Sequence, residues 1–442
     1  MKVIYDISVL GLGHYIPCNR AGIFRSVESV AYGLADSQEC DLAFCAIKSF
    51  EKFQTLVACL DYLEANARLK EVPLPHCSSI KKIPYKKLHG VNSEINDTTL
   101  QLKRLLLKGI RKYLDCTAKA FEFYNRVMVK DYSYPIYPNS LAETDIFHST
   151  NFPIPEQVKE AKHVKKILTI YDLIPILYPH FFEFDKNKGH FLEEVLKKLD
   201  KENEYVICIS NATKNDLCNY LNISPSRVFV TPLAADSALF YPCSDFDKVE
   251  LVRKKYHIPN APYILSLSTL EPRKNLDHAI KCFAKLVQQE HIKDLYFVLV
   301  GTKGWKYNKI FEELSNYDFL KDRIILTGYV ADEDLAALYS GALAFVYPSF
   351  YEGFGLPPLE AMQCGIPVIT SNTSSLPEVV GDAGIMLAPT DTDGLCQSIL
   401  EIYNSLSLQR SMSLKSLEQA KQFSWGKCVK ETISAYKTVL VS

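Results

Sequence analysis

The 442-residue sequence has almost no net charge and no long apolar run. It carries 50 basic and 51 acidic residues, so its overall charge gives no indication of a nucleic-acid partner. No run of 18 or more apolar residues occurs, and Asp6 interrupts the apolar start MKVIYDISVL. The sequence therefore predicts neither a transmembrane helix nor a signal peptide.

Paired cysteines are also missing. The 13 cysteines are an odd number at scattered spacings, and no Cys-x-x-Cys occurs. This pattern argues against a zinc ribbon and against a disulfide framework. Reduced, mostly buried thiols in a cytoplasmic protein fit it better.

What the sequence does contain is a series of short, β-branched apolar runs, each followed by a longer mixed segment. Runs that are buried on both faces and alternate with helical segments predict parallel sheets with crossover helices. The strands that we expect are 2–8, 41–47, 145–150, 165–173, 205–210, 227–233, 263–269, 295–301, 323–328, 342–349, 366–372 and 384–389.

This strand pattern pauses once, between Ala234 and Pro262, where the chain is polar and charged. A domain boundary is expected there. The sequence thus predicts an α/β fold with two doubly wound, Rossmann-like domains, 1–240 and 241–422. Two such domains can face each other across a cleft, and ligands bind beyond the carboxyl ends of their strands.

Two of these strand ends are followed by residues suited to a phosphate. Arg273 and Lys274 are adjacent, just after a predicted strand and just before a helix from about Leu276. They could neutralise a diphosphate leaving group, although a solvated basic pair is the ordinary alternative. Gly22 begins a helix after the first strand, where free backbone N–H groups could meet a phosphate. Arg25 is either a solvated helix residue or an anion contact.

Two glutamates, Glu352 and Glu360, flank a glycine loop and a Pro-Pro step. Glu360 is expected in the first turn of a helix, where the helix dipole alone favours a carboxylate. It could equally accept hydrogen bonds from the diol of a ribose. Glu352 lies in the glycine loop and has no capping role, so a functional role is favoured.

Two further strand ends carry His148 and Asp172, and both side chains could face the cleft. A lone histidine, however, is more often structural. The pattern Asp332-x-Asp334 could suggest a metal, but it precedes an apolar helical pattern. Acidic residues at a helix start explain it better, so no metal site is predicted.

Residues 101–131 carry eight Lys or Arg and three Asp or Glu. Leu102, Leu105 and Ile110 can share one face of a helix. Such a helix could lie on the anionic inner face of the cell membrane, or it could pack against the protein with a solvated face.

The stretches RKN (273–275) and YEGFGLPPLEAMQCGIPVI (351–369) together strongly resemble the retaining glycosyltransferases of family GT4, which have the GT-B fold. The spacing of Glu352 and Glu360 matches the Glu-x7-Glu motif of that family. The resemblance covers most of the chain and is densest in the second half. Supporting stretches are GIFR (22–25), ISNATKNDL (209–217), VTPLAAD (230–236), LVGTKGW (299–305), LTGYVADEDLAALYSGA (326–342) and SLPEVVGDAG (375–384).

This resemblance implies a role for each motif. Glu360 is implied to hold the nucleotide ribose, and Arg273 and Lys274 the diphosphate. Glu352 is implied to act with the amides of the glycine loop on the donor sugar. The other donor-binding positions that the resemblance implies are Gly22, Gly301, Val330, Gly353, Phe354, Gly355 and Leu356.

One position departs from the family. Tyr171 precedes Asp172 where the family often has a histidine, so the contact of that histidine with the donor sugar falls to His148 or to Tyr171. Arg25, Tyr171 and Asp172 are assigned to the acceptor side. The segment 423–442 resembles the last helix of the family, which returns to the first domain.

Within the family the chain is most similar to bacterial mannosyltransferases that build O-antigen and capsule chains. The resemblance implies retaining transfer from GDP-mannose to a glycan or lipid-linked saccharide, without a metal or another cofactor. Three alternatives remain. The first is a UDP- or dTDP-linked donor (glucose, N-acetylhexosamine or rhamnose). The others are a nucleotide-sugar epimerase of the same fold and a non-catalytic sugar-nucleotide sensor.

A dinucleotide-dependent oxidoreductase is a further alternative, because two doubly wound domains suit that class as well. However, no Gly-x-Gly-x-x-Gly follows a predicted strand. The Gly-Leu-Gly at 11–13 does not continue with the required third glycine. The sequence therefore favours the transferase.

Overall fold

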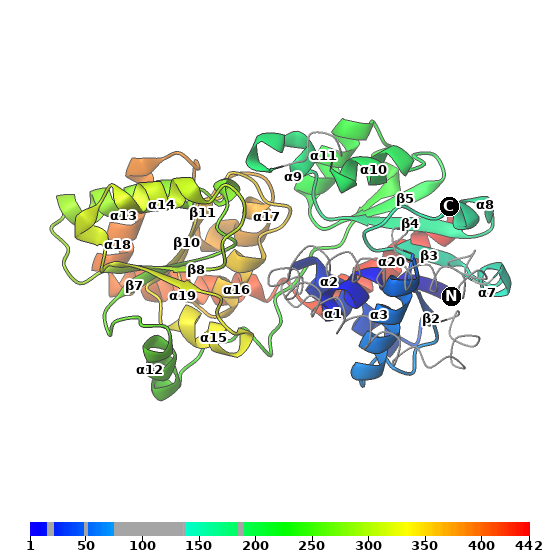
Figure 1. Ribbon diagram of the computed structural model, residues 1–442, viewed down its shortest axis with the longest axis horizontal. Coiled ribbons are helices and arrows are strands. Elements are labelled where there is room, and N and C mark those ends of the chain that lie inside the picture. Colours follow the sequence, from blue (N-terminus) through cyan, green and yellow to red (C-terminus); the bar gives the residue numbers. More distant parts are fainter. Residues whose placement is uncertain (16–21, 48–51, 75–135, 137, 184–189) are drawn as a thin grey trace, which may run out of the picture. The chain divides into compact units, whose positions relative to one another are not determined.

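The computed structural model describes residues 1–15, 22–47, 52–74, 136, 138–183 and 190–442. The basic stretch 101–131, with its predicted membrane contact, lies outside the described residues. Within them the chain forms two six-stranded sheets with helices flanking the strands (Figure 1). The predicted α/β class is confirmed, and the strands pair in parallel.

The first sheet has the order β2-β1-β3-β4-β5-β6. Its strands are buried along most of their length, as in β1, where only Lys2 is exposed. Ile4 of β1 lies opposite Ala43 on one side and Phe147 on the other. The strands are β1 (Lys2–Asp6), β2 (Asp41–Cys45), β3 (Ile146–Ser149), β4 (Lys165–Ile170), β5 (Glu204–Cys208) and β6 (Val228–Val230).

The helices of this half connect its strands. The second helix begins at Gly22, as predicted, and buries Phe24, Val27 and Leu34 at helical spacing. An additional helix at Ser8–Tyr15, which the sequence analysis does not predict, directly follows β1. The helices are α1 (Ser8–Tyr15), α2 (Gly22–Asp36), α3 (Lys52–Ala65), α7 (Pro138–Ala142), α8 (Glu156–Glu160), α9 (Ile174–Leu177), α10 (Phe191–Lys198) and α11 (Asn211–Leu221).

The second sheet has the order β12-β11-β10-β7-β8-β9. The strands β7 and β10, which precede the two candidate stretches, are therefore neighbours in the middle of the sheet. Ile264 of β7 lies opposite Ala344 of β10. The strands are β7 (Tyr263–Leu267), β8 (Tyr296–Val300), β9 (Ile324–Gly328), β10 (Ala344–Tyr347), β11 (Val368–Ser371) and β12 (Ile385–Leu387).

Helices cover both faces of this sheet, which is why its strands are apolar on both sides. Leu265 packs into a core with Leu359 on one face, whereas Ile264 packs with Phe283 on the other. Figure 1 shows α13, α14 and α18 on one side and α15 and α16 on the other. The helices are α12 (Phe246–Lys255), α13 (Leu276–Gln289), α14 (Asn308–Ser315), α15 (Asp332–Ser340), α16 (Leu356–Gln363), α17 (Leu376–Val380), α18 (Thr392–Asn404), α19 (Leu406–Ala420) and α20 (Trp425–Val441).

Two predicted helix starts are confirmed, at Leu276 and at Asp332. Asp334, in the first turn of α15, accepts hydrogen bonds from Lys255 Nζ at 2.6 Å and from the Tyr256 hydroxyl at 2.7 Å. The acidic pair therefore lies at a helix start, as its sequence context predicts. Asp334 also contacts the end of α12, which the sequence does not predict.

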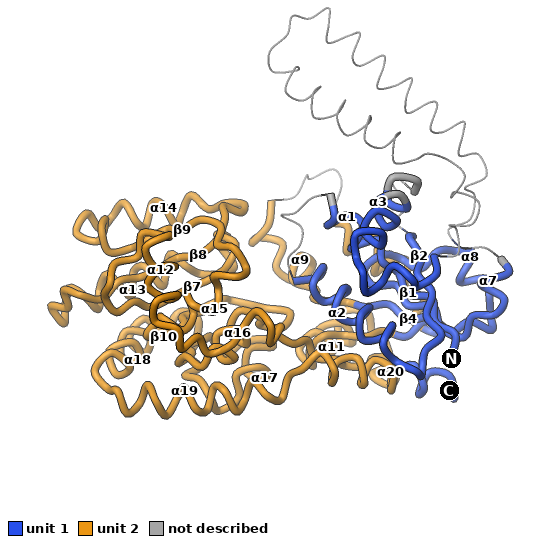
Figure 2. The backbone as a smooth tube through the Cα atoms, turned by 90° about the horizontal axis from the view of Figure 1, so that it is seen from below, with its two compact units in different colours: residues 1–169, 202–205, 436–442 blue, residues 170–201, 206–435 orange. Residues whose placement is uncertain are grey.

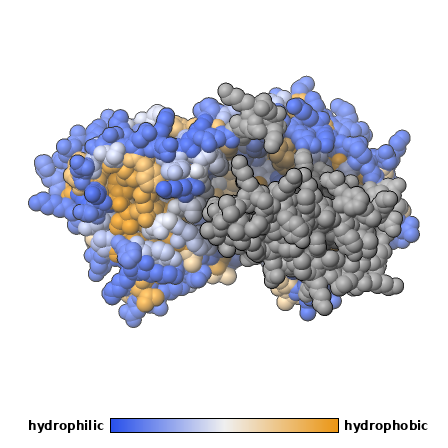
Figure 3. Space-filling model, viewed as in Figure 1, coloured by the Kyte–Doolittle hydropathy of each residue, from blue (hydrophilic) through white to orange (hydrophobic). Residues whose placement is uncertain are grey.

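The strand β9 forms one edge of the second sheet. In Figure 3 an apolar patch lies on the left, over the part of the molecule where Figure 1 labels the strands of this sheet. Leu326 of β9 is 40% exposed, and Tyr329, which follows the strand, is 71% exposed. An edge strand also carries backbone groups that no neighbouring strand pairs. This edge is thus partly uncovered.

The chain divides into two compact units, shown in Figure 2. One comprises residues 1–169, 202–205 and 436–442, and the other comprises 170–201 and 206–435. The domain boundary predicted at 240–241 and the return of 423–442 to the first domain stay predictions. Within the described ranges, no helix is long and apolar enough to span a membrane.

Candidate active site

The two basic residues lie in a short 3-10 turn, Pro272–Lys274, between β7 and α13. The next residue, Asn275, has a φ of 57°, which is uncommon for a residue other than glycine. Its side-chain amide donates to the carbonyls of Pro348 at 3.0 Å and Pro389 at 2.7 Å. Asn275 therefore ties the turn after β7 to the loop after β10.

These loops bring four charged side chains together in a buried cluster. Arg273 Nη1 lies 2.6 Å from Glu352 Oε2, and Lys274 Nζ lies 2.7 Å from Glu352 Oε1. Arg273 Nη2 also pairs with Glu271 at 2.7 Å. The Ser349 hydroxyl donates to Glu352 Oε1 at 2.6 Å. The predicted basic pair and the first glutamate thus form one network of two cations and two carboxylates.

Charge pairing controls the protonation of this cluster. Burial alone would raise the pKa of Glu352, but the charges of Arg273 and Lys274 lower it to about 2. The pKa of Lys274 is lowered, first by burial and then by the neighbouring positive charge of Arg273. Burial disfavours the charge of Arg273, yet Glu352 and Glu271 raise its pKa overall. Glu352 is therefore ionised at neutral pH.

One donor of the cluster is left over. The Nε of Arg273 is buried and has no hydrogen-bond partner in the described chain. Lys274 Nζ donates to the Tyr347 hydroxyl and to Glu352, both at 2.7 Å, which accounts for two of its three protons. A buried donor without an acceptor is costly in a native protein unless a ligand or water completes it. The cluster is therefore suited to receive a further anion.

Serine and threonine hydroxyl groups donate hydrogen bonds to the backbone carbonyls of the glycine loop. Ser375 donates to the carbonyls of Glu352 at 2.9 Å and Phe354 at 2.6 Å. Ser210, at the N-cap of α11, donates to the carbonyl of Gly353 at 2.7 Å, and Thr213 approaches the same oxygen at 3.3 Å. All three consecutive carbonyls of this loop are therefore occupied.

The backbone N–H groups of the same loop, unlike its carbonyls, are left without hydrogen bonds among the described residues. In the described part of the chain, no group accepts a hydrogen bond from the N–H of Gly353, Phe354 or Gly355. Three consecutive free amides form a donor set that suits an anion or the oxygens of a sugar. This arrangement is the one that the resemblance implies for these positions.

Gly353 permits a close approach of the segment after β4. A Cβ at this position would lie 2.6 Å from the carbonyl oxygen of Tyr171 and 2.8 Å from Cβ of Asp172. Although part of Asp172 is exposed, burial of its carboxyl raises its pKa, and the charge of Arg273 offsets this only in part. The predicted acceptor-side residues Tyr171 and Asp172 therefore lie directly against the glycine loop.

Glu360 lies elsewhere than expected along its helix. Because α16 begins at Leu356, Glu360 is in the second turn and not in the first, so the prediction of a first-turn position was wrong. The helix dipole at the N-terminus therefore does not explain this carboxylate. Glu360 is 7% exposed, and its Oε2 accepts a hydrogen bond from the Tyr339 hydroxyl at 3.0 Å.

The remaining donor-side positions fall into two groups. Gly301 directly follows β8 and has a φ of 143°, and a Cβ there would lie 1.8 Å from the carbonyl oxygen of Ser268. The side chains of Val330 and Phe354 are buried in the core, and Leu356 packs against it. These three residues could reach a donor only through their backbone or by lining the site.

His148 is satisfied by neutral partners. It is 2% exposed on β3, with the Tyr436 hydroxyl 2.6 Å from Nδ1 and the Thr169 hydroxyl 2.7 Å from Nε2. Burial lowers its pKa to about 3, so the ring is neutral at physiological pH. These contacts are those of a structural histidine, and its proposed contact with the donor sugar stays a prediction. Gly22 and Arg25 belong to the same compact unit as His148.

Several residues of the cluster escaped the sequence analysis. Glu271 is only two positions before Arg273 and is 2% exposed, so an acid beside a basic pair was an available signal. Ser210 and Ser375 lie in stretches that carry the resemblance, and Ser349 is three positions before Glu352, but nothing in the sequence indicates which groups their hydroxyls contact. Only the folded chain brings Ser210 and Ser375 to the glycine loop.

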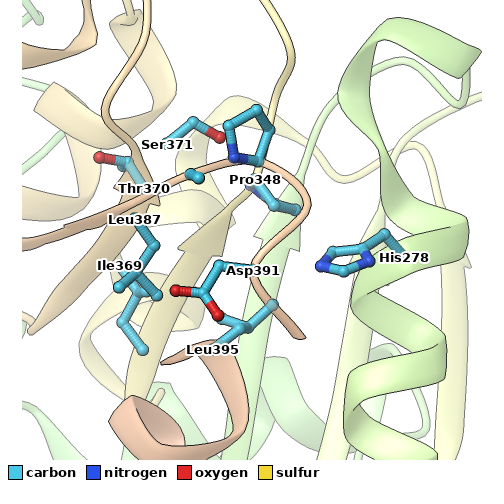
Figure 4. Close-up of a pocket in the computed structure, with 10 residues that line it drawn as sticks. His278, Pro348, Ile369, Thr370, Ser371, Leu387, Asp391 and Leu395 are labelled. Atoms are coloured by element: carbon cyan, nitrogen blue, oxygen red, sulfur yellow. The ribbon is translucent and has the colours of Figure 1, made fainter. Parts of the chain in front are cut away.

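A small cavity is lined by Pro348 and Pro389, the two residues whose carbonyls accept from Asn275 (Figure 4). His278 points into it from α13 toward Asp391, and Pro348 and Ser371 close it from the strand ends. It contains none of the predicted site residues. In the described part of the chain, no group of three or more His, Cys, Asp or Glu side chains could hold a metal ion. The expected independence from metals stays a prediction.

Comparison with known proteins agrees with this geometry. The family model of the glycosyl transferases group 1 matches residues 248–418. O-antigen chain mannosyltransferase B of Escherichia coli is 35% identical over 292 residues, which cover 66% of this chain and 74% of that protein. The chain belongs to the group 1 glycosyltransferases. A second relative, the serotype-specific mannosyltransferase WbdA of E. coli, is 28% identical over 278 residues. These cover 63% of this chain but only 34% of WbdA.

Solved structures establish the fold of this transferase. A glycosyltransferase from Rickettsia africae superposes with a TM-score of 0.62 at 17% identity, covering 99% of this chain and 98% of that one. The predicted GT-B fold of two Rossmann-like domains is confirmed. The predicted glycosyltransferase family is confirmed as well.

Proposed function

We propose that this glycosyltransferase is a retaining mannosyltransferase that uses GDP-mannose and extends a bacterial surface polysaccharide. Its acceptor in this proposal is a glycan or a lipid-linked saccharide. The names of two relatives, an O-antigen chain mannosyltransferase and a serotype-specific mannosyltransferase, support the sugar and the pathway. A UDP- or dTDP-linked sugar is the alternative donor.

The observation that carries the proposal is the buried cluster of Arg273, Lys274 and Glu352, in which one arginine donor is left over. The oxygens of a donor diphosphate would accept hydrogen bonds from Arg273 Nε and from the third proton of Lys274 Nζ. As the bond from the sugar to the phosphate breaks, negative charge grows on the diphosphate. Two preorganised cations stabilise that charge more in the transition state than in the ground state.

In this proposal Glu352 has a double role. Its two oxygens hold both cations at 2.6 and 2.7 Å, so they are in position before the donor arrives. A carboxylate has about four acceptor sites, and the described contacts occupy three of them. The remaining site can accept a hydroxyl of the donor sugar, while the free amides of the glycine loop hold its other oxygens. Glu360 is assigned to the ribose.

A thermal-shift series tests the donor. GDP-mannose, UDP-glucose, UDP-N-acetylglucosamine and dTDP-rhamnose are compared at equal concentration. A ligand at about 100 times its Kd stabilises the native state by roughly 2.7 kcal/mol. We expect the largest rise in Tm with GDP-mannose, and a smaller rise for Arg273→Ala. A larger rise with another nucleotide sugar would contradict the donor assignment.

Product analysis tests the reaction. NMR of the product is expected to show an α-linkage from the α-configured donor. Inversion at the anomeric carbon would contradict retention. Nucleotide release without a glycosidic product would favour the epimerase, and donor binding without any turnover would favour the sensor.

The cellular location is part of the same proposal. We place the protein in the cytoplasm, at the inner face of the membrane, through the basic stretch 101–131. Each Lys or Arg near an anionic surface contributes about 1 kcal/mol. Replacing five basic residues by glutamine should weaken binding to anionic vesicles: Lys103, Arg104, Lys108, Arg111 and Lys112. Equal binding to neutral and anionic vesicles would contradict the electrostatic contact.

A further inference from the structure

Three pairs of aromatic rings lie beside the charged cluster. In each pair one ring comes from the segment Tyr178–Phe182, and its partner comes from a loop after β8 or β10. All six side chains are partly exposed. The pairs, with the distances between ring centroids, are Tyr178 and Tyr351 at 4.7 Å, Phe181 and Phe350 at 5.6 Å, and Phe182 and Trp305 at 5.4 Å. We call these six residues the aromatic wall.

Hydrogen bonds hold the wall in place. The indole N–H of Trp305 donates to the carbonyl of Phe181 at 2.7 Å. Lys306 Nζ donates to the carbonyls of His180 at 3.0 Å and Phe182 at 2.8 Å. The rings are therefore ordered before any ligand binds, which reduces the entropy lost on binding.

The wall adjoins the candidate site at two points. Tyr351 immediately precedes Glu352, and its carbonyl accepts a hydrogen bond from Arg273 Nη1 at 2.6 Å. At the other point, the segment that carries Tyr178 begins at Tyr171 and Asp172, which lie against Gly353. The wall thus extends from the position where Glu352 would meet the donor sugar.

A carboxylate accompanies the rings. The hydroxyl of Tyr351 donates to Asp216 at 2.8 and 3.0 Å, so a hydrogen-bond acceptor lies at the edge of the wall. A pyranose presents apolar C–H faces and hydroxyl-rich edges. Partly exposed rings beside a carboxylate match that chemistry, because aromatic side chains combine apolar area with a polar rim.

We propose that the aromatic wall is the subsite for the acceptor saccharide. This rests on the proposed function. The nucleotide base of the donor is the other flat or ring-shaped group that such rings could bind. The acceptor is favoured because Tyr351 of the wall directly precedes Glu352, which the proposed function places at the donor sugar, whereas the base would adjoin the ribose that is assigned to Glu360.

Fluorescence offers a direct test, because the chain has only two tryptophans, Trp305 and Trp425. In a Trp425→Phe variant, Trp305 is the single reporter. We titrate it with α-1,2-linked and α-1,3-linked mannotriose in the presence of GDP. A saturable change in emission, weakened when Phe182→Leu is added, supports the proposal. No saturable change with either trisaccharide overturns it.

Steady-state kinetics separate the acceptor from the donor. Phe182→Leu keeps the apolar volume but loses the ring, so the KM for the acceptor should rise about tenfold while the KM for the donor stays constant. Phe246→Leu, 86% exposed on α12, is the matched control and should leave both constants unchanged. A rise in the donor KM alone would assign the wall to the base. Unchanged KM values for donor and acceptor would show that the aromatic wall is only a packing contact. Either of these two results overturns the proposal.

The two proposals fail in different ways. If the wild-type chain transfers no sugar from any donor, the proposed function fails. If it transfers sugar and the Phe182→Leu variant keeps its acceptor KM, only the aromatic wall loses its role. A Tm measurement on each variant confirms that the fold is intact before the constants are compared.

Discussion

His148 on β3 and Glu352 after β10 are both buried titratable residues, and the sequence marks both as candidate catalytic groups. The histidine meets two neutral hydroxyls, so burial lowers its pKa to about 3 and it stays uncharged. The glutamate meets Arg273 and Lys274, which lower its pKa to about 2 against the effect of burial, so it stays charged.

This difference shows how a buried polar group can be judged. The described contacts occupy both ring nitrogens of His148. In the cluster around Glu352, the Nε of Arg273 has no partner among the described residues. The three free amides of the glycine loop directly follow Glu352. Burial is common to both sites, whereas unused donors mark the one that is suited to a ligand.

Removing a cation should give the largest effect at the charged site. We expect Arg273→Ala and Lys274→Ala each to lower turnover by roughly 10²–10³-fold, because each removes a preorganised contact to the leaving diphosphate. Each variant also leaves buried Glu352 with one cation, which costs about 3–5 kcal/mol of unfolding free energy. Turnover and urea unfolding are measured together.

The matched control is Lys254→Ala, since Lys254 forms a solvent-exposed pair with Glu250 on α12. It should change neither quantity appreciably. Near-normal turnover in folded Arg273→Ala or Lys274→Ala would refute the role of the charged cluster.

The two glutamates sharpen the comparison within the charged site. Glu352→Gln should lower kcat more than it raises KM, because Glu352 holds the cations that act in the transition state. Glu360→Gln should chiefly raise the KM for the donor, because the ribose changes little during reaction. The kinetics are measured with varied donor at saturating acceptor. The reverse pattern would exchange the two roles.

A variant of Ser210 tests whether the hydrogen bond to the Gly353 carbonyl positions the glycine loop for catalysis. Ser210→Ala removes the donor to Gly353 and also the N-cap of α11, which costs about 1 kcal/mol. A misplaced loop should lower kcat by up to about 10²-fold. Ser210→Thr keeps both hydrogen bonds and should restore kcat. Ser224→Ala on the surface is the control, and equal kcat in Ser210→Ala and wild type would remove the positioning role.

Acid unfolding separates His148 from Glu352. Below its ordinary pKa of 6.5 the unfolded chain protonates His148, but the folded chain does not until about pH 3. Stability is therefore lost as the pH falls through that window. Glu352 contributes stability above its ordinary pKa of 4.5, which is lost as the pH falls toward 2.

His148→Gln should therefore lose less unfolding free energy than wild type between pH 6.5 and 4.5. Urea unfolding at several pH values measures it, and His291→Gln at an exposed position is the control. If the unfolding free energies of His148→Gln and wild type fall in parallel with pH, the fold does not hold this histidine neutral.

The smallest expected effect concerns metal ions. If two cations of the protein neutralise the diphosphate, an excess of EDTA should leave turnover unchanged. A loss of activity that returns on addition of Mg²⁺ or Mn²⁺ would show that a bound cation shares the task of Arg273 and Lys274.

The sequence by itself determined the strands and several helix starts, because apolar periodicity and helix-start residues are local signals. Every strand of both sheets overlaps a predicted run, and only Glu204 of β5 lies outside its run, by one residue. The helices at Gly22, Leu276 and Asp332 begin where expected. The sequence also identified Arg273, Lys274 and Glu352, although it did not show that they pair.

Only the tertiary structure decided which groups satisfy one another. His148 meets Tyr436, 288 positions away, and Gly353 meets Ser210, 143 positions away. The position of Glu360 beside Tyr339, the pairing of Glu271 with Arg273 and the aromatic wall were likewise invisible. These contacts depend on which strand ends become neighbours. That order is set by packing across the whole sheet, and no short stretch of sequence encodes it.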